Sequence, residues 1–326
     1  MRLKSALRRG VAAAVIAGIV VSSGIPAYAI RWDIADGDIT VKAGDEGTNR
    51  VTQGKTIEQE DRDTVITGES EEHTVTIDTS GGKVDVTFDD LKIDVSGKKE
   101  GDGSDDSPVR ESKAAVTVQG DGDATIELDG KNELKSGSNN AGLEKNKQES
   151  KGTLTIKDDK GKDGSLTAEG GEGGAGIGGG NGQVTVGSNV TVDSEQTTPS
   201  LTPYSSGGGT VTISGGTVEA VSTEGVGIGS GGMPFYQSET PAVDQYIHRV
   251  SGEAGTFATG TDGNAMLIAT GGTDHIEDDD DTSAWYGVIF LGSEGQIYGD
   301  KVTLSTDCTI PGGKQLTIGE GQSLLL

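Results

Sequence analysis

The stretch Gly173-Gly-Ala-Gly-Ile-Gly-Gly-Gly180 decides the fold, because it returns in altered form as Gly225-Val-Gly-Ile-Gly-Ser-Gly-Gly232. The lone isoleucines between the glycines, Ile177 and Ile228, are 51 positions apart. An apolar position that recurs within the same glycine pattern indicates a structural repeat. We expect each of these isoleucines to fill the interior of one repeat, while the glycines permit tight corners and close approach of neighbouring turns of the chain.

Short apolar–Thr–apolar triplets surround these two glycine boxes and are bounded by Gly, Asp, Asn and Ser. Alternation of period two places both apolar side chains on one face and Thr on the other, which predicts half-buried strands. No stretch after residue 29 has the 3.6-residue period of a helix, so we predict an all-β chain. The predicted strands lie at 75–77, 84–86, 116–118, 125–128, 154–156, 165–168, 184–186, 190–192, 211–213 and 217–220.

These strands recur at a nearly regular interval. Leu154, Val184 and Val211 step by 30 and 27 positions, and a second series of strands steps by 24 and 28. A period of 24–30 residues with two or three short strands predicts a β-solenoid, in which each coil buries its apolar row against the next coil. This architecture suits a chain with 55 Gly and only 31% hydrophobic residues, because it needs thin apolar ladders rather than one globular core.

The charge of the chain narrows the class of partner. It has 52 acidic and 26 basic residues, and four of the basic residues fall within the first 29 positions, which contain no acid. The remaining chain therefore carries 22 basic against 52 acidic residues, a formal charge of −30. A surface of this sign repels the phosphates of nucleic acid and favours divalent cations and neutral or cation-bridged ligands. The alternative is that the acidity only keeps a secreted protein soluble.

Residues 1–29 have the pattern of a signal peptide. Basic residues from Arg2 to Arg9 precede an apolar run, and Ala27-Tyr-Ala29 is a small-x-small cleavage pattern. The apolar run at 11–21 is short for a membrane span, and no second run follows it. We therefore predict a secreted, extracellular or cell-surface protein whose mature chain does not span a membrane.

The mature chain divides into two parts. Residues 30–232 carry the repeats and form the predicted β-helix body. Residues 233–326 are predicted to be a β-rich continuation or cap, and nine of the twelve aromatic residues lie beyond position 200. Within this second part, Met266-Leu-Ile268 and Gly287-Val-Ile-Phe-Leu291 are continuously apolar, which suits strands covered on both faces.

Acidic turns suggest a site for a hard cation. Asp159 and Asp163 lie in a glycine-containing turn that fits the EF-hand loop only in part, since Gly161 takes one ligand position and Gly170 stands where a Glu is required. We take Asp159 and Asp163 as the best candidates for Ca²⁺ ligands, with a solvated turn as the alternative. The sole cysteine, Cys308, excludes an intrachain disulfide and a thiolate metal site.

Nucleotide binding and catalysis find little support in the sequence. Gly174, Gly176 and Gly179 match G-x-G-x-x-G, but a strand rather than a helix is expected to follow, and no P-loop lysine is present. The chain has three histidines and no nucleophile elbow, and its many carboxylates single out no catalytic pair. We predict that the protein is not an enzyme.

Three aromatic residues of the second part are candidates for a sugar platform, because ring faces pack on the apolar faces of sugars. These are Tyr236, Trp285 and Tyr286. The alternative is that the rings pack the end of the solenoid.

Longer strings extend these motifs to most of 36–326. They are Asn139-Asn-Ala-Gly-Leu-Glu-Lys-Asn146, Gly152-Thr-Leu-Thr-Ile156, the glycine boxes, Gly255-Thr-Phe-Ala-Thr-Gly-Thr-Asp-Gly-Asn-Ala265 and Thr309-Ile-Pro-Gly-Gly-Lys314. In this ordered combination the chain resembles the Gly-rich secreted bacterial proteins known as carbohydrate-binding domain-containing proteins. The resemblance implies a right-handed parallel β-helix, calcium ions, and binding to plant-wall or acidic polysaccharide without known catalysis. It assigns no role to any single residue.

The sequence thus favours a secreted, non-catalytic β-helix that binds extracellular polysaccharide with the assistance of calcium. A structural or adhesive cell-surface spacer without glycan binding is the first alternative. A polysaccharide lyase is the second, less favoured one.

Overall fold

The computed structural model describes residues 30–97, 112–147, 149–161, 163–180, 208–231, 257–259, 265–272, 274–276, 282, 285–304 and 309–325. The fold is all-β, as predicted, and the helical elements with defined bounds are two short 3₁₀ turns, η1 (Ile34–Asp36) and η2 (Asp45–Gly47). No helix in the described part of the chain is long and apolar enough to cross a membrane. Eight of the ten predicted strands are found, and the strands predicted at 184–186 and 190–192 lie outside the described residues, as do residues 1–29 and Cys308.

A sheet of nine strands forms one side of the molecule. Seven of its strands, which run from β2 at one end to β20 at the other, pair in parallel. At the N-terminal end, β2, β3 and β4 form antiparallel hairpins. We call the parallel part wall 3. It contains β2 (Ile39–Ala43), β6 (Val75–Asp78), β8 (Val116–Gln119), β11 (Leu143–Glu144), β14 (Ile177–Gly178), β17 (Val226–Gly229) and β20 (Asp274–Ile276), and the hairpins add β3 (Asn49–Gln53) and β4 (Thr56–Asp61).

A sheet of fourteen strands forms the other two sides, because it has two arms that meet in the long strand β7 (Val84–Asp94). The first half of β7 pairs with β9 and the second half with β10, and β1 (Arg31–Asp33) and β5 (Val65–Ser70) lie above β7. Wall 1 continues through β9 (Ala124–Asp129), β12 (Thr153–Lys157), β15 (Thr210–Ile213) and β18 (Phe257–Thr259). Wall 2 continues through β10 (Lys131–Lys135), β13 (Ser165–Glu169), β16 (Thr217–Val221), β19 (Met266–Thr270) and β21 (Gly287–Leu291).

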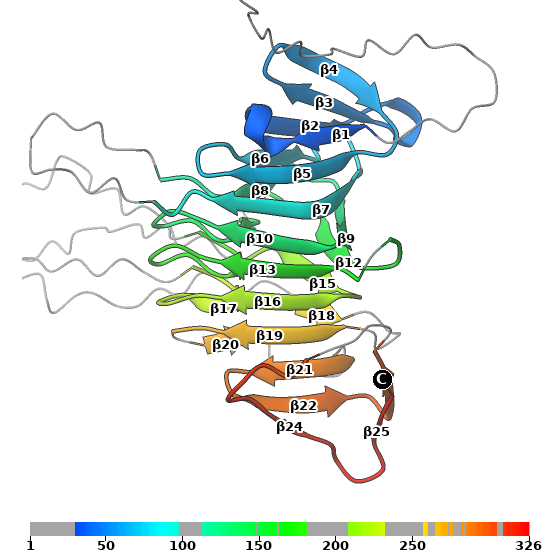
Figure 1. Cartoon of the computed structure of the whole chain (residues 1–326), viewed down its shortest axis with the longest axis vertical. Coiled ribbons are helices and arrows are strands. Elements are labelled where there is room, and N and C mark those ends of the chain that lie inside the picture. The colour runs from blue at the N-terminus through cyan, green and yellow to red at the C-terminus, as the bar shows by residue number, and fades with distance from the viewer. Residues whose placement is uncertain are drawn as a thin grey trace, which may run out of the picture.

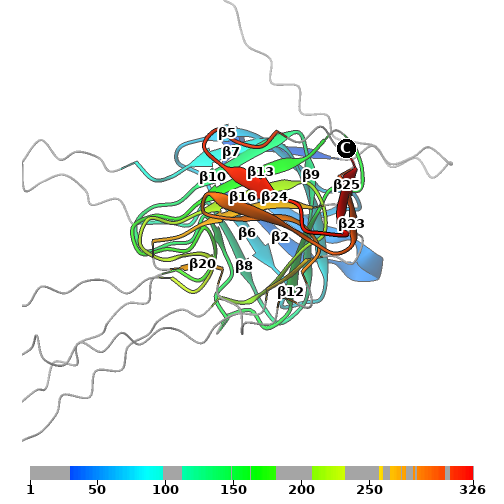
Figure 2. The ribbon, with the colours of Figure 1, turned by 90° about the horizontal axis from the view of Figure 1, so that it is seen from below.

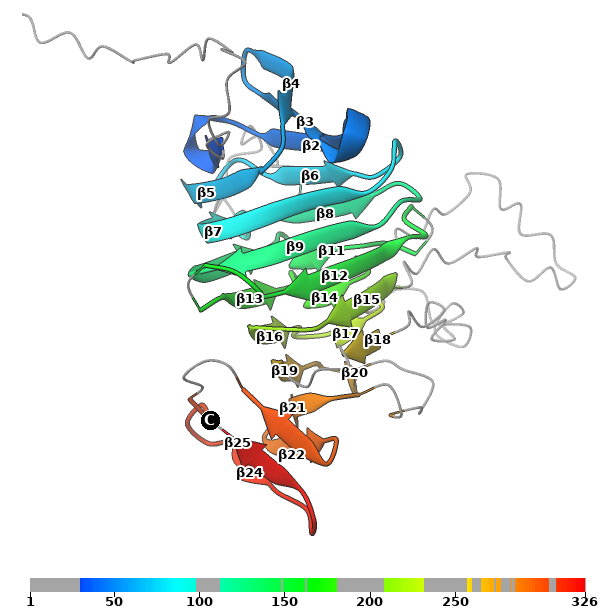
Figure 3. The same ribbon diagram turned by 90° about the vertical axis from the view of Figure 1, so that its right-hand side faces the viewer.

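The chain visits the three walls in a constant order. Strands β8, β9 and β10 form one round through wall 3, wall 1 and wall 2, and the rounds that begin at β11, β14 and β17 repeat this order. The rounds stack along the long axis of the molecule (Figures 1 and 3). Viewed along that axis, the walls surround a common interior (Figure 2).

Register partners confirm the spacing of the glycine boxes, and they match the expected period at one step of wall 1 but not at the next. Ile177 pairs with Ile228, 51 positions later. Leu154 pairs with Ala124, 30 positions earlier, within the predicted period of 24–30 residues, but it pairs with Val211 57 positions later, so the predicted period is wrong for that later step. The reason is that the strands keep their register while the connections between them differ in length.

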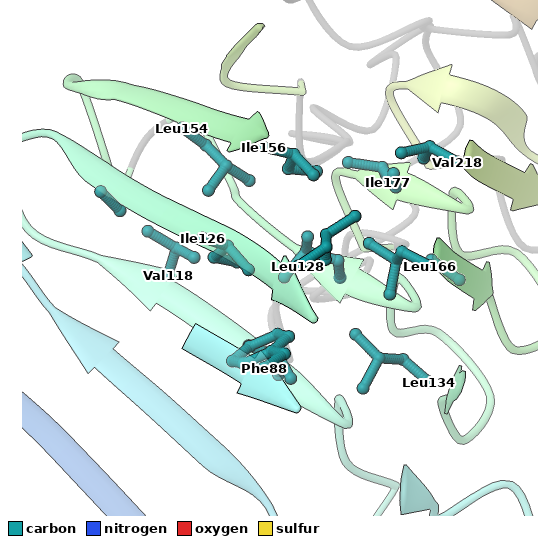
Figure 4. Close-up of a cluster of buried hydrophobic side chains, with 14 of the residues drawn as sticks. Phe88, Val118, Ile126, Leu128, Leu134, Leu154, Ile156, Leu166, Ile177 and Val218 are labelled. Carbon is teal, nitrogen blue, oxygen red and sulfur yellow. The ribbon is translucent and has the colours of Figure 1, made fainter. Parts of the chain in front are cut away.

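Inward side chains from all three walls form one apolar core (Figure 4). Ile126 of wall 1, Leu166 of wall 2 and Ile177 of wall 3 are each at most 1% exposed. The position of Ile177 confirms that the lone isoleucine of the glycine box fills the interior. Burial of such a side chain is worth about 1.5–3 kcal/mol, so the stacked rows supply the cohesion of the chain.

The glycines of the first box are required by the stacking. A Cβ at Gly174 would collide with the backbone oxygen of Asn140 in the preceding round, and a Cβ at Gly176 would lie 2.5 Å from the backbone nitrogen of Val221. The next residues enter β14, a strand. Within the residues described up to Gly180, the G-x-G-x-x-G pattern is therefore a packing element, as expected, and opens no helix, while the strand expected to follow it lies outside the described residues.

The C-terminal part continues wall 2 and buries the outer face of its strands β19 and β21. Leu267 of β19 and Ile289 of β21 point into the main core, whereas Ile268 and Phe290 belong to a second apolar cluster on the opposite face. The continuous apolar runs thus mark strands buried on both faces, as predicted. Strand β22 (Glu294–Tyr298) is antiparallel to β21 and continues the sheet to β24 (Gln315–Thr317), whereas β23 (Lys301–Thr303) and β25 (Ser323–Leu325) form a separate two-stranded sheet.

Candidate functional site

Wall 1 carries aligned threonines on its outer face. Thr125 of β9, Thr155 of β12 and Thr212 of β15 are register partners in one row, and Thr153 and Thr210 are partners in a second row. They point outward because the residues that alternate with them are buried in the core. Neighbouring strands lie about 4.8 Å apart, so each row is an evenly spaced series of hydroxyls. We call these five residues the threonine face.

The hydroxyls of the threonine face are not engaged by other described residues. Thr125 is 9% exposed and the other four are half-buried, and within the described residues none of the five hydroxyls makes a hydrogen bond. The outer face of wall 2 differs, because its charged side chains bond to one another. The pairs are Lys92 with Glu69 at 3.2 Å, Lys131 with Glu133 at 2.7 Å and Lys135 with Glu169 at 2.9 Å.

Glu127 anchors a loop at the corner between walls 1 and 2. Its Oε1 accepts hydrogen bonds from the backbone N–H groups of Asp159 and Lys160, both at 2.7 Å. Its Oε2 lies 3.2 Å from Nζ of Lys157, close enough for an ion pair but without the alignment of a hydrogen bond. The Glu127 side chain is buried, so the loop that follows β12 is tied to the preceding round through a carboxylate shielded from water.

The two predicted calcium ligands lie on this loop. Both Asp159 and Asp163 are exposed. The carboxylate of Asp159 is 2.6 Å from Nζ of Lys157, and this hydrogen bond raises the pKa of Lys157. A calcium ion would have to displace that ammonium group. In the described ranges, no set of three or more His, Cys, Asp or Glu side chains is arranged to hold a metal ion.

A neighbouring carboxyl group supports the loop from within. Oδ2 of Asp158 accepts a hydrogen bond from the backbone N–H of Gly164 at 2.9 Å. Burial raises the pKa of Asp158, and the charges of Glu127 and Asp163 add to the effect. The loop therefore concentrates negative charge at the edge of the threonine face.

The predicted aromatic platform is not an open surface at Trp285. This side chain is 7% exposed, and its ring makes edge contacts with Phe257 at 5.6 Å and Tyr298 at 5.1 Å between ring centroids. That arrangement favours the packing alternative. Tyr286 is half-buried, and its backbone N–H donates to the hydroxyl of Thr259. Tyr236 lies outside the described residues.

Two buried charged residues escaped the sequence analysis. Glu144 accepts hydrogen bonds from the backbone N–H of Ala141 at 3.2 Å and from the Asn146 amide at 3.1 Å, and burial raises the pKa of its carboxyl to about 7. Lys145 is fully buried, its Nζ donates to the hydroxyl of Ser150 at 2.5 Å, and burial lowers its pKa to about 8.

A signal for Lys145 was present in the sequence. The pairing of Leu143 with Val116 places Lys145 opposite Val118, an inward position of the preceding round. A lysine at an apolar position of the alternation indicates a buried charge. Because Lys145 is closed off from solvent, its place supports a structural rather than a catalytic role.

Comparison with known proteins assigns no family. No protein-family model matches the chain, and neither a curated protein nor a solved structure matches it. The class of protein is therefore defined by the fold alone, an all-β chain whose parallel strands stack in rounds.

Proposed function

We propose that this protein is a secreted right-handed parallel β-helix that binds an extracellular polysaccharide without catalysis, and that the threonine face is its binding surface. The β-helix is supported by the constant order of the three walls and by the parallel pairing along each of them. Right-handedness is the rule for connections between parallel strands of one sheet.

The row of Thr125, Thr155 and Thr212 carries the proposal. Each hydroxyl is both a donor and an acceptor, as is each hydroxyl of a sugar. A polysaccharide repeats its hydroxyls along one direction, so an evenly spaced row on a rigid wall can bind several sugar units at once. Many weak contacts then add up to useful affinity through multivalency.

The charged groups beside the face favour binding over catalysis. A polysaccharide lyase needs a base that is free of its proton near neutral pH. Lys157, the lysine that ends β12, has a raised pKa because of its hydrogen bond to Asp159, so it stays protonated. This observation supports a non-catalytic surface.

Calcium is a subsidiary part of the proposal. A cation bound near Asp159 and Asp163 would reduce repulsion among the carboxylates of the loop and hold it beside the threonine face. Carboxylate oxygens in a flexible turn are the donors that Ca²⁺ prefers.

A pull-down on insoluble polysaccharides tests the function. The double variant Thr155→Val and Thr212→Val keeps the shape and β-branching of both side chains but removes two hydroxyls. Loss of two hydrogen bonds of about 0.5–1.5 kcal/mol each should weaken retention about tenfold. Thr167→Val, on wall 2, is the matched control and should bind as the wild type does. Retention that is equal in both variants would contradict the assignment of the face.

The same experiment separates the alternatives. Release of products with new double bonds, seen by their absorbance, would identify a lyase. Retention on no polysaccharide would favour a surface spacer.

A further inference from the structure

We infer that the threonine face selects an uncharged polysaccharide over one that carries uronate groups. The inference rests on the proposed function, because it names the substrate class of the same face.

Carboxylates border the threonine face on several sides. Asp85 of β7 is the register partner of Thr125, so it lies outside the threonine face and next to the end of its first row. Asp123 stands just before β9, and its Oδ1 accepts the backbone N–H of Thr153 at 2.8 Å. Glu127 follows two residues after Thr125 in the same strand. Together with Asp121 and the three aspartates of the loop after β12, these make seven carboxylates beside four lysines (Lys83, Lys151, Lys157 and Lys160), so a negatively charged glycan that lay along the rows would meet an excess of like charge.

The lysines at the border are already neutralised. Nζ of Lys157 lies 2.6 Å from Asp159 and 3.2 Å from Glu127. Two further pairs are Lys83 with Asp85 at 2.9 Å and Lys151 with Asp121 at 3.3 Å. To bind a uronate, each ammonium group would have to give up a fixed carboxylate for an equivalent one on the ligand. Such an exchange yields no net gain in charge pairing and costs the desolvation of the ligand.

The loop after β12 does not reverse this balance. Lys160 is exposed on the loop, but Asp158, Asp159 and Asp163 belong to the same loop. An incoming anion would therefore meet an excess of negative charge there as well.

An uncharged glycan has no such barrier. The threonine hydroxyls can donate to and accept from its hydroxyls, and no ion pair has to be broken. Because the contacts are between neutral groups, binding should depend little on ionic strength.

The test compares the full chain on cellulose, a neutral polysaccharide, with its binding to polygalacturonate. Both are measured in EDTA and in millimolar calcium, at low and high sodium chloride. We expect retention on cellulose in every buffer, and binding to polygalacturonate at least tenfold weaker. Equal or tighter binding to polygalacturonate in either buffer would overturn the inference and leave the proposed function standing. Binding to neither would overturn the proposed function, and the inference with it.

A charge variant tests the electrostatic cause. Asp85→Asn removes one carboxylate from the border and frees Lys83, so binding to polygalacturonate should rise about fivefold while binding to cellulose stays unchanged. Asp45→Asn is the matched control, since Asp45 is also exposed and paired, with Arg50 at 2.8 Å, in the N-terminal turn η2. The inference fails if the two variants behave alike.

Discussion

The Glu127 carboxylate accepts the backbone N–H of Asp159, although the two residues belong to successive rounds of the chain. A second backbone N–H, that of Lys160, donates to the same oxygen. Backbone donors that are withdrawn from water must find such partners. One side chain of β9 thus determines the conformation of the loop that borders the threonine face.

Removing this carboxylate should release the loop. Glu127→Ala leaves two backbone donors without an acceptor, and we expect a loss of about 1–3 kcal/mol of stability. Amide hydrogen exchange at Asp159 and Lys160 should accelerate before global unfolding. Glu133→Ala on wall 2 is the control, because its ion pair with the exposed Lys131 is screened by solvent and contributes little to stability. Unchanged exchange in the Glu127 variant would show that the loop is held in another way.

The buried carboxyl of Glu144 should make stability depend on pH. Its pKa is about 7 in the folded chain, whereas the ordinary value for a glutamate is 4.5. Between these two pH values the folded state therefore binds more protons than the unfolded state. The contribution of Glu144 to stability should therefore be greatest below about pH 4.5 and fall as the pH rises through 7, by up to about 3 kcal/mol.

Glu144→Gln removes this dependence. The variant should melt higher than the wild type at pH 8 and close to it at pH 4.5, since its side chain carries no charge at either pH. Glu172→Gln, at an exposed glutamate, is the control and should leave the pH profile intact. Parallel wild-type and Glu144 profiles from pH 4 to 8 would refute the assignment.

Lys145 should act at alkaline pH in the opposite direction. Its pKa is about 8 in the folded chain, whereas the ordinary value for a lysine is 10.5. Between these two pH values the unfolded state therefore binds more protons than the folded state. The contribution of Lys145 to stability should rise as the pH increases from 8 to 10.5, because the cost of its buried charge disappears. Lys145→Met should abolish this rise, as measured by chemical denaturation at several pH values. Lys151→Met, at an exposed lysine, should keep it.

Calcium should raise the melting temperature if the loop of Asp159 and Asp163 binds it. A ligand specific for the folded state adds about 2.7 kcal/mol at a hundredfold excess over its Kd. The shift should exceed that of magnesium, which demands a stricter octahedral geometry. Replacing both residues with Asn should blunt the response. Equal shifts with calcium, magnesium and matched sodium chloride would indicate charge screening alone, and the site assignment would then be dropped.

The sequence predicted strands well because alternation is a local property. The triplet around Thr155 and the apolar run at 287–291 each reveal which sides of a strand are buried. The order of stacking is not local. The strand of Leu154 has the same pattern as many others, so only the folded chain shows that Val211 is its partner.

The candidate site was less accessible to sequence analysis for the same reason. Every outward threonine is visible in the alternation, but the alignment of Thr125, Thr155 and Thr212 depends on register. The burial of Trp285 depends on Phe257, which is distant in sequence, and composition alone does not reveal that contact.

The two ends of the stack differ from its middle. At one end the hairpins finish in β4, whose exposed Glu58 and Glu60 discourage the addition of a strand from another molecule. At the other end β22 runs antiparallel to β21, and β24, parallel to β22, is the last strand of the sheet. Between these ends the rounds share the order of the three walls, although their connections differ in length. Duplicating a round should therefore lengthen the threonine face by one rung of about 4.8 Å without redesigning either end.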